Sequence, residues 1–396
     1  MSAQKLIRSI RTPRTEVVRA RLADWTTAYP DDVRVRLLDE ARGRTGRPAH
    51  GWEDAFLRAM VSGSEERCPD DGSLDPGGSD LGGLPFRLTL GRDWALFQHS
   101  HALGDGTPTW DFLGMLLASA GPRRHRAAPV TAGPLSRGLL TAFGRSRSRL
   151  SLAITVQREL RQLRTPGARA AVDSGPGAPT FAVTAAASSD SFIQQVREMR
   201  AARGSTASVM SIVTLRALLL CRHHGLDVDD TMVFMVDLRR YLAVDAVVEG
   251  NFSWSKSVPI LDTDTPAQLS TRIGRILDSG LPLLTFGDAL QRFVILHSGR
   301  PPARGNGDRV RMMMSFGTRW STVPPPAGPE PPLITVSIAP PGPNFVGFNI
   351  VEAYGRMHVS LNRSAATLDR VVAERIATDL VADLGTGPVD ETLWAR

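Results

Sequence analysis

Cysteine is scarce in this 396-residue chain, which holds only Cys68 and Cys221. Two cysteines cannot supply a disulfide framework or, by themselves, a cysteine-based zinc site, so we expect reduced thiols. Long apolar runs are also missing, because the longest, at residues 210–221, carries Arg216 and is far shorter than the ~20 residues that cross a bilayer. The basic N-terminal segment has no continuous apolar core of a secretory signal. These absences argue against a membrane span and predict a cytoplasmic protein.

Lysine is nearly absent as well, since only Lys5 and Lys256 among the 47 basic residues are lysine. The net charge of +7 could suggest a polyanionic partner, but an arginine excess of this kind is typical of a GC-rich coding sequence. We therefore expect no nucleic-acid partner. The densest basic run spans residues 123–169, with Glu159 as its only acidic residue. It is either a solvated connecting segment or a docking surface for something anionic.

Several common chemical signatures do not occur in the sequence. Serine-hydrolase elbows, phosphate-binding glycine loops, the HExxH zinc motif and cysteine–histidine zinc spacings are all missing. The sequence therefore predicts no metal site and no permanently bound cofactor.

Proline- and glycine-rich breaks divide the chain. The better boundary is the segment at residues 165–180, which predicts an N-terminal lobe at 1–165, a linker at 166–180 and a C-terminal lobe at 181–396. The mixture of helices with mostly short strands favours an α/β sandwich over a strictly alternating parallel fold.

Hydrophobic periodicity and turn residues locate the individual elements. In the N-terminal part they predict a hairpin at residues 86–99 and a helix beginning near Thr107 and Pro108. The C-terminal part is predicted to hold strands at 181–187, 231–240, 251–260 and 310–315, helices at 192–203 and 208–224, two amphipathic stretches at 267–297, a closing hairpin-like pair of 334–340 with 344–362, and a last helix around 368–380.

The junction between the first hairpin and its helix carries the strongest chemical signal. Residues 99–106 read HSHALGDG, which places His101 four residues before Asp105, a carboxylate flanked by Gly104 and Gly106. Glycines allow the backbone to turn sharply beside a ligand. An imidazole is suited to removing a proton from a hydroxyl or amine near neutral pH. The alternative for His101 is a histidine at the surface or at the edge of the core. For His99 we favour a structural histidine over a second base.

This string resembles the His-His-x-x-x-Asp-Gly signature of the chloramphenicol-acetyltransferase-like superfamily. That superfamily includes peptide-synthetase condensation domains, plant BAHD acyltransferases, and bacterial polyketide-associated and wax-ester-forming acyltransferases. The resemblance implies that His101 is the catalytic base, with Asp105 and Gly106 as structural members of the motif. Ser100 stands where many relatives carry the first histidine, which counts against an ordinary condensation domain.

Two later segments fit the same resemblance. Residues 236–240 (VDLRR) resemble the family's Asp-x-Arg segment, which implies that Arg239 pairs with Asp105; otherwise Arg239 is a surface arginine. Residues 250–252 (GNF) resemble its Gly-Asn strand. Asn251 there could equally be a turn former. No convincing counterpart of the plant Asp-Phe-Gly-Trp-Gly motif is present. His223 and His224 follow an apolar helix and are explained as a helix C-terminal cap rather than a metal site.

The family resemblance implies two chloramphenicol-acetyltransferase-like α/β lobes that form a V, with a tunnel along their interface. It implies acyl transfer from a thioester to a hydroxyl or amine of a small-molecule acceptor. Acyl-CoA is the favoured co-substrate, and an acyl-pantetheine on a carrier protein is the alternative. Asn251, Ser253 and Ser255 are soft candidates for oxyanion or substrate contacts. Two other functions stay open: a free-standing condensation enzyme that uses a carrier-bound donor, and a catalytically degenerate binding module.

Overall fold

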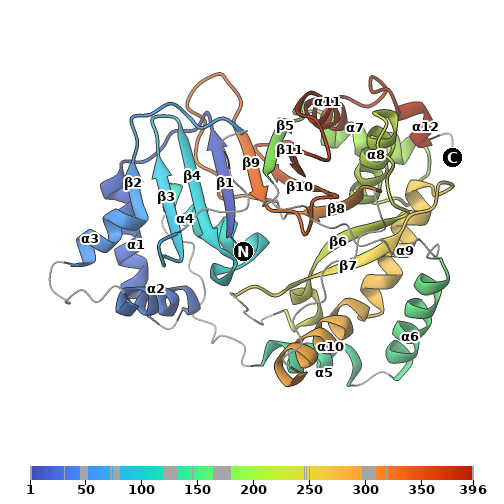
Figure 1. Cartoon of the computed structure of the whole chain (residues 1–396), viewed down its shortest axis with the longest axis horizontal. Helices are drawn as coiled ribbons and strands as arrows, with labels where there is room; N and C mark the ends of the chain where they lie inside the picture. The colour runs from blue at the N-terminus through green and yellow to red at the C-terminus, as the bar shows by residue number, and fades with distance from the viewer. Residues whose placement is uncertain are drawn as a thin grey trace.

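Two mixed β-sheets stand side by side in this computed structural model, and each carries its own helices (Figure 1). The residues that the structure describes are 2–30, 32–44, 52–71, 74, 81–118, 133–144, 147–163, 180–244, 246, 248, 250–296, 309–317 and 319–394. The linker predicted at 166–180 therefore lies outside the described residues except for its last position. Within the described part, no helix is long and apolar enough to cross a membrane.

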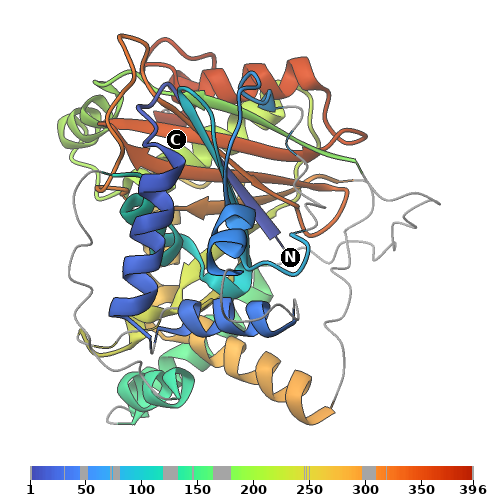
Figure 2. The same cartoon turned by 90° about the vertical axis from the view of Figure 1, so that its left-hand side faces the viewer.

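The N-terminal sheet has five strands. In order they are β2 (Val61–Gly63), β3 (Phe86–Leu90), β4 (Trp94–Ser100), β1 (Ser2–Arg8) and β9 (Leu333–Ile338). The helices of this lobe are α1 (Thr15–Ala28), α2 (Val33–Arg44), α3 (Trp52–Met60) and α4 (Gly106–Leu117). Apolar residues of the sheet and these helices form one core, and α1 is the long dark blue helix in Figure 2, where this lobe faces the viewer.

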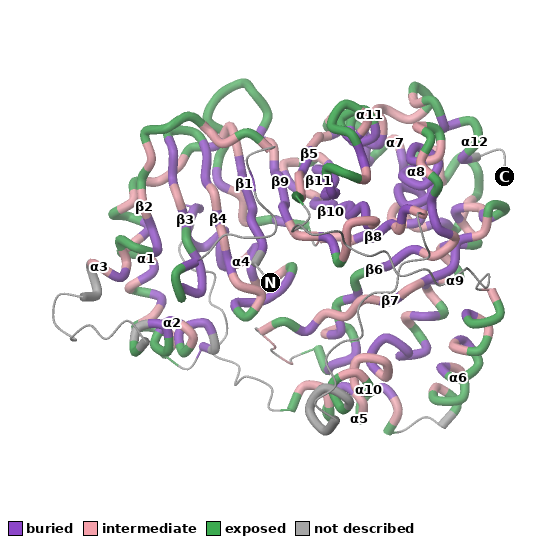
Figure 3. The backbone as a smooth tube through the Cα atoms, viewed as in Figure 1, coloured by how far each residue is buried: buried purple, intermediate pink, exposed green. Residues whose placement is uncertain are grey.

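The C-terminal sheet has six strands. In order they are β5 (Phe181–Ala187), β11 (Arg356–Ser364), β10 (Phe345–Ala353), β8 (Arg311–Phe316), β6 (Thr231–Asp237) and β7 (Ser253–Pro259). Its helices are α7 (Phe192–Ala202), α8 (Val209–His223), α9 (Pro266–Asp278), α10 (Leu281–Leu296), α11 (Arg370–Val381) and α12 (Asp390–Trp394). Figure 3 shows the buried strands flanked by helices whose outer sides are exposed.

Most predicted elements are confirmed. The hairpin is β3 and β4, and the long apolar run is α8, a buried helix whose Arg216 forms an ion pair with Asp390 at 3.1 Å. Because that run is buried on nearly all sides, it reads as apolar without being a membrane span. Strand β1 was not predicted; its residues are the basic N-terminal segment.

The prediction that residues 334–340 pair with residues 344–362 is wrong for the first of these two segments. Residues 344–362 fold back on themselves as β10 and β11, through a turn in which Tyr354 and Gly355 both have positive φ. Such two-residue turns match the twist of a hairpin. The segment predicted as their partner is β9, which pairs with β1 of the other sheet instead. Its alternating pattern fits either sheet, so the pattern alone could not choose the partner.

On each side of the predicted boundary at residue 165, some elements pack in the lobe to which they were not assigned. Strand β9 completes the N-terminal sheet, although its residues belong to the predicted C-terminal lobe. Helices α5 (Pro134–Phe143) and α6 (Arg147–Gln162) belong to the predicted N-terminal lobe, but their buried residues join apolar clusters with residues of the C-terminal lobe. The two lobes are therefore not two consecutive pieces of chain.

A row of polar side chains on β11 joins the two sheets at β9. Three backbone N–H groups on the outer edge of β9 donate to them: Ile334 to His358 Nδ1 at 3.3 Å, Val336 to Ser360 Oγ at 2.8 Å and Ile338 to Asn362 Oδ1 at 2.9 Å. β11 contributes every second residue because side chains alternate between the two faces of a strand, and β9 does so because alternate backbone N–H groups point to the same edge. These bonds satisfy a strand edge that would otherwise be unpaired.

Acid is expected to weaken this junction through His358. Its Nδ1 must stay unprotonated to accept from Ile334, and burial lowers the pKa of His358 from 6.5 to about 4. As pH falls from 6.5 towards 4, the unfolded chain binds a proton at this ring and the folded chain does not, so stability is lost. Between pH 7.5 and pH 5 the His358 contribution to the free energy of unfolding should fall by about 2 kcal/mol.

Chemical denaturation at the two pH values measures this effect. His358→Asn keeps a side-chain acceptor but cannot titrate, so its loss between the two pH values should be smaller than that of the wild type by that amount. An equal loss in both proteins would contradict the role of His358.

Candidate active site

The HSHALGDG segment forms the connection between β4 and α4. Strand β4 ends at Ser100, a single 3-10 turn (η2, His101–Leu103) follows, and α4 begins at Gly106. Gly104 has φ of 140°, a conformation that side chains with a Cβ rarely adopt. Gly106 has no such constraint, and a Cβ built there would have no atom within 4 Å. The glycine required by the backbone of this loop is therefore Gly104.

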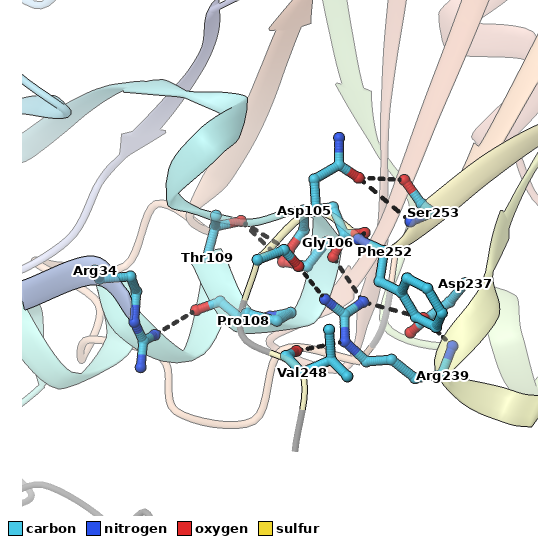
Figure 4. Close-up of polar contacts among 12 residues, drawn as sticks. Arg34, Asp105, Gly106, Pro108, Thr109, Asp237, Arg239, Val248, Phe252 and Ser253 are labelled. Carbon is cyan, nitrogen blue, oxygen red and sulfur yellow. Dashed lines mark hydrogen bonds and ion pairs between the residues drawn. The ribbon is translucent and has the colours of Figure 1, made fainter. Parts of the chain in front are cut away.

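Asp105 uses both of its carboxylate oxygens to bind the other lobe (Figure 4). Oδ1 accepts from Arg239 Nη1 at 2.8 Å, and Oδ2 accepts from the backbone N–H of Phe252 at 2.9 Å. The Asp105 side chain is only 10% exposed. Within the described part of the chain these bonds hold the loop to the other lobe, and no hydrogen bond joins the Asp105 carboxylate to the His101 ring.

Arg239 lies on η3 (Leu238–Tyr241), which follows β6 directly. Besides Asp105, its guanidinium donates to the carbonyl oxygens of Val248 at 2.7 Å and Gly250 at 2.5 Å, and to Asp237 Oδ1 at 3.0 Å (Figure 4). One planar cation thereby joins the motif loop to the segment that leads into β7. Such a forked contact set suits arginine and not lysine.

His101 stands at the start of η2 with its ring partly buried. Burial lowers its pKa below 6.5, and nearby positive charge, that of Lys5 included, lowers it further. The ring is therefore neutral at pH 7 and able to accept a proton. Its Nδ1 is buried and has no hydrogen-bond partner among the described residues, so the accessible part of the ring does not include Nδ1.

His99 is more deeply buried than His101. Its ring stacks on Phe97 at 5.0 Å between centroids, and burial lowers its pKa well below 6.5. The residue is 2% exposed, and its ring is edge-on to His101 at 6.1 Å. These contacts are those of a packed structural histidine.

Lys5 is a member of this region that the motif search did not find. Its ammonium lies over the Trp110 ring at 4.4 Å and donates to Thr109 Oγ1, which in turn donates to the Gly106 carbonyl at 2.9 Å. Burial lowers the pKa of Lys5 to about 7, and the charge of Asp105 opposes that shift. The available signal was compositional, because Lys5 is one of two lysines among 47 basic residues.

The three residues predicted as oxyanion or substrate contacts, Asn251, Ser253 and Ser255, lie at the start of β7. Asn251 Oδ1 accepts from the Ser253 backbone N–H at 3.3 Å and from its hydroxyl at 3.0 Å, which is a local turn. The Ser253 proton is thus engaged, and the remaining donor of Asn251 is its amide Nδ2. Ser255 lies two residues further along the same strand face and is half-buried. The bond from Phe252 to Asp105 fixes this strand start beside the motif loop.

The histidine pair His223 and His224 lies at the end of α8, away from this region. His224 follows the last residue of α8, its backbone N–H donates to the Leu220 carbonyl, and its ring lies 3.4 Å from Asp379. Across the residues that the structure describes, no three histidine, cysteine, aspartate or glutamate side chains are grouped to hold a metal ion.

No protein-family model matches the chain, and no curated protein matches it by sequence. Solved structures do match over nearly its whole length. A trichothecene 15-O-acetyltransferase from Fusarium sporotrichioides is 13% identical, with a TM-score of 0.57 over 95% of this chain and 88% of its own. Polyketide synthase associated protein 5 from Mycobacterium tuberculosis is 17% identical, with a TM-score of 0.51 over 96% and 94%. The starter condensation domain of rhizomide synthetase, solved as a mutant in complex with C8-CoA, is 12% identical, with a TM-score of 0.53 over 96% and 87%.

These matches show the fold. The chain has the two-lobed α/β architecture of the chloramphenicol-acetyltransferase-like acyltransferases and condensation domains. The tunnel between the lobes stays a prediction.

Proposed function

We propose that the protein is an acyltransferase that moves an acyl group from a thioester to a hydroxyl or amine of a small molecule, with His101 as general base. The observation that carries this proposal is the arrangement of the motif loop. It presents a neutral, partly accessible imidazole, while Asp105 is fully used in holding the loop to the other lobe. The fold that the chain shares with solved acyltransferase structures supports this chemistry.

The proposed reaction needs no acyl-enzyme intermediate. His101 removes the proton from the acceptor hydroxyl or amine, and the acceptor oxygen or nitrogen attacks the thioester carbonyl carbon. The carbonyl π electrons move onto oxygen, and they return as the C–S bond breaks. The thiolate takes the proton from His101, so an ester or amide and a free thiol leave and the base is restored. The Asn251 amide and backbone N–H groups are the candidates to bind the transient oxyanion.

The donor is proposed to be an acyl-CoA. One structural relative was solved with C8-CoA, which supports that choice. The basic run at 123–169 is the feature that could instead receive an acidic carrier protein. In its described part, Arg149 donates to the backbone carbonyls of Asp278 at 2.8 Å and Ala142 at 3.4 Å. That arginine is engaged in joining helices, which favours the structural interpretation of the run.

Steady-state assays with matched donors test the function and the donor together. We expect thiol release that depends on an acceptor, with a several-fold higher kcat/KM for an acyl-CoA than for the same acyl group on a carrier protein. Arg145→Glu and Arg147→Glu are the informative charge reversals, because Arg149 has the structural contacts described above. Efficient turnover of the carrier-bound donor alone, lost in these two variants, would identify a condensation enzyme instead.

A third outcome of the same assay addresses the binding-module alternative. A protein that binds acyl-CoA but releases no thiol with any acceptor would be a recruitment module. Ser100, in place of the first motif histidine, and the missing C-terminal motif are the sequence features that favour this alternative.

A further inference from the structure

The inner face of the C-terminal sheet carries an unexplained polar row. One face of this sheet is covered by helices, and the side chains that pack against them are apolar: Met232, Phe234, Met312, Met314, Val346, Phe348, Ile350, Val359 and Leu361. The alternate residues point to the opposite, inner face. There Ser360 of β11 stands beside Asn349 of β10, and Asn349 stands beside Ser315 of β8.

The row continues through β6 to β7, the strand whose start is tied to the motif loop. Met235 of β6 directly follows Phe234, which pairs with Met314, and so Met235 falls beside Ser315. Met235 also pairs with Ser255 of β7. Ser255 is two residues, or about 7 Å along the strand, from Ser253 at the end tied to the motif loop. The row thus leads from the neighbourhood of Asp105 across the sheet.

Burial increases along this row from β6 to β11. Met235 is 38% exposed, a large value for an apolar side chain in the middle of a sheet, and Ser255 and Ser315 are half-buried. Asn349 is 4% and Ser360 is 1% exposed. Ser360 accepts from Val336 of β9, which closes the row at the junction between the lobes. The row is therefore open near the candidate site and closed at the far end.

Asn349 is the anomaly in this row. Its amide Nδ2 is buried and has no hydrogen-bond partner in the described part of the chain. By contrast, the amide of Asn362 on the same face donates to the Val336 carbonyl at 3.0 Å. A buried donor without an acceptor carries a desolvation penalty that an apolar side chain of similar size would avoid. The position therefore needs an acceptor that none of the described residues provides.

We propose that Ser255, Met235, Ser315 and Asn349 form a substrate subsite, in which the Asn349 amide donates to a hydroxyl or carbonyl oxygen on the body of the substrate. The inference rests on the proposed function, because the row begins on β7, whose first residues are tied to the motif loop that carries His101. It assigns an oxygenated substrate in place of a plain hydrocarbon one. A site built around a buried donor rejects an analogue that lacks the acceptor, because the donor is then left unpaired.

The oxygen could belong to the acyl group or to the acceptor, and two binding experiments distinguish them. Calorimetry would compare 3-hydroxyoctanoyl-CoA with octanoyl-CoA, and 1-phenyl-1,2-ethanediol with 2-phenylethanol. We expect the oxygenated member of one pair to bind the wild type at least about tenfold more tightly. Asn349→Leu should abolish that ratio. Equal affinity within both pairs would overturn the proposal.

Asn362→Leu is the matched control, because it removes an asparagine on the same face whose amide is already bonded. It should lower the melting temperature and leave the binding ratio unchanged. Asn349→Leu should keep or raise the melting temperature, since it removes an unpaired donor. A lower melting temperature with an unchanged ratio would show that Asn349 is structural. These binding measurements do not depend on turnover. If the affinity ratio is lost in Asn349→Leu but the wild type shows no turnover, the acyltransferase proposal is rejected and the subsite proposal stands.

Discussion

Replacing His101 with alanine is expected to lower kcat/KM for acyl transfer by about 100-fold or more, the usual contribution of a positioned general base. The fold should persist, because the ring is only partly buried and its Nδ1 bonds no described residue. Thiol-release kinetics measure the first effect, and thermal unfolding checks the second. Unchanged turnover with the natural acceptor would reject the mechanism.

The neighbouring imidazole supplies the control for this prediction. His99→Phe keeps an aromatic ring against Phe97 and should retain most of the activity, because His99 is 2% exposed and cannot reach an acceptor. The pH profile gives a second check. A general base works only when deprotonated, so kcat/KM should fall as pH drops through the His101 pKa, which lies below 6.5. A fall in kcat/KM with an apparent pKa above 6.5 would identify another group as the base.

Asp105→Ala is expected to lower the free energy of unfolding by about 3 kcal/mol or more, because it leaves the largely buried Arg239 guanidinium without its buried partner. It also removes the acceptor of the Phe252 backbone N–H. Both contacts join the motif loop to the other lobe, so the loss should appear as early melting and reduced activity together. Chemical denaturation measures the free energy.

Asp237→Ala is the matched control on the same arginine. The Asp237 carboxylate also bonds Arg239, at 3.0 Å, but its side chain is 52% exposed, and exposed ion pairs contribute about 0–1 kcal/mol. Asp237 also accepts from the Arg239 backbone N–H at 2.9 Å, so this variant should lose only about 1 kcal/mol, clearly less than Asp105→Ala. If Asp105→Ala instead melted like the wild type and was inactive, its carboxylate would act in the chemistry, against the structural role assigned to it.

The sequence alone located the parts of the site that are close together in the chain. His101, Asp105 and the two glycines fall within six residues, and the hairpin and helix around them follow from alternation and from Thr107 and Pro108. Arg239 was reached only through the family resemblance, because nothing local to it names a partner 134 residues away. Lys5 and Asn349 were missed as site residues. Lys5 stands out in composition, but its place beside the motif loop depends on the packed chain, and Asn349 is unusual only in what surrounds it.

Local patterns thus determined the elements, and the tertiary structure decided how they combine. Hydrophobic periodicity, together with the residues that begin and end helices, identifies a strand or helix because these patterns act within a few residues. They cannot specify which sheet edge a strand joins, since β9 has the same alternation whether it pairs with β10 or with β1. Burial, too, is a property of the packed chain: it lowers the pKa of Lys5 to about 7 and leaves the Asn349 amide unpaired. The motif was fixed by its residues, whereas the surroundings that make it a site arise only when distant strands pack together.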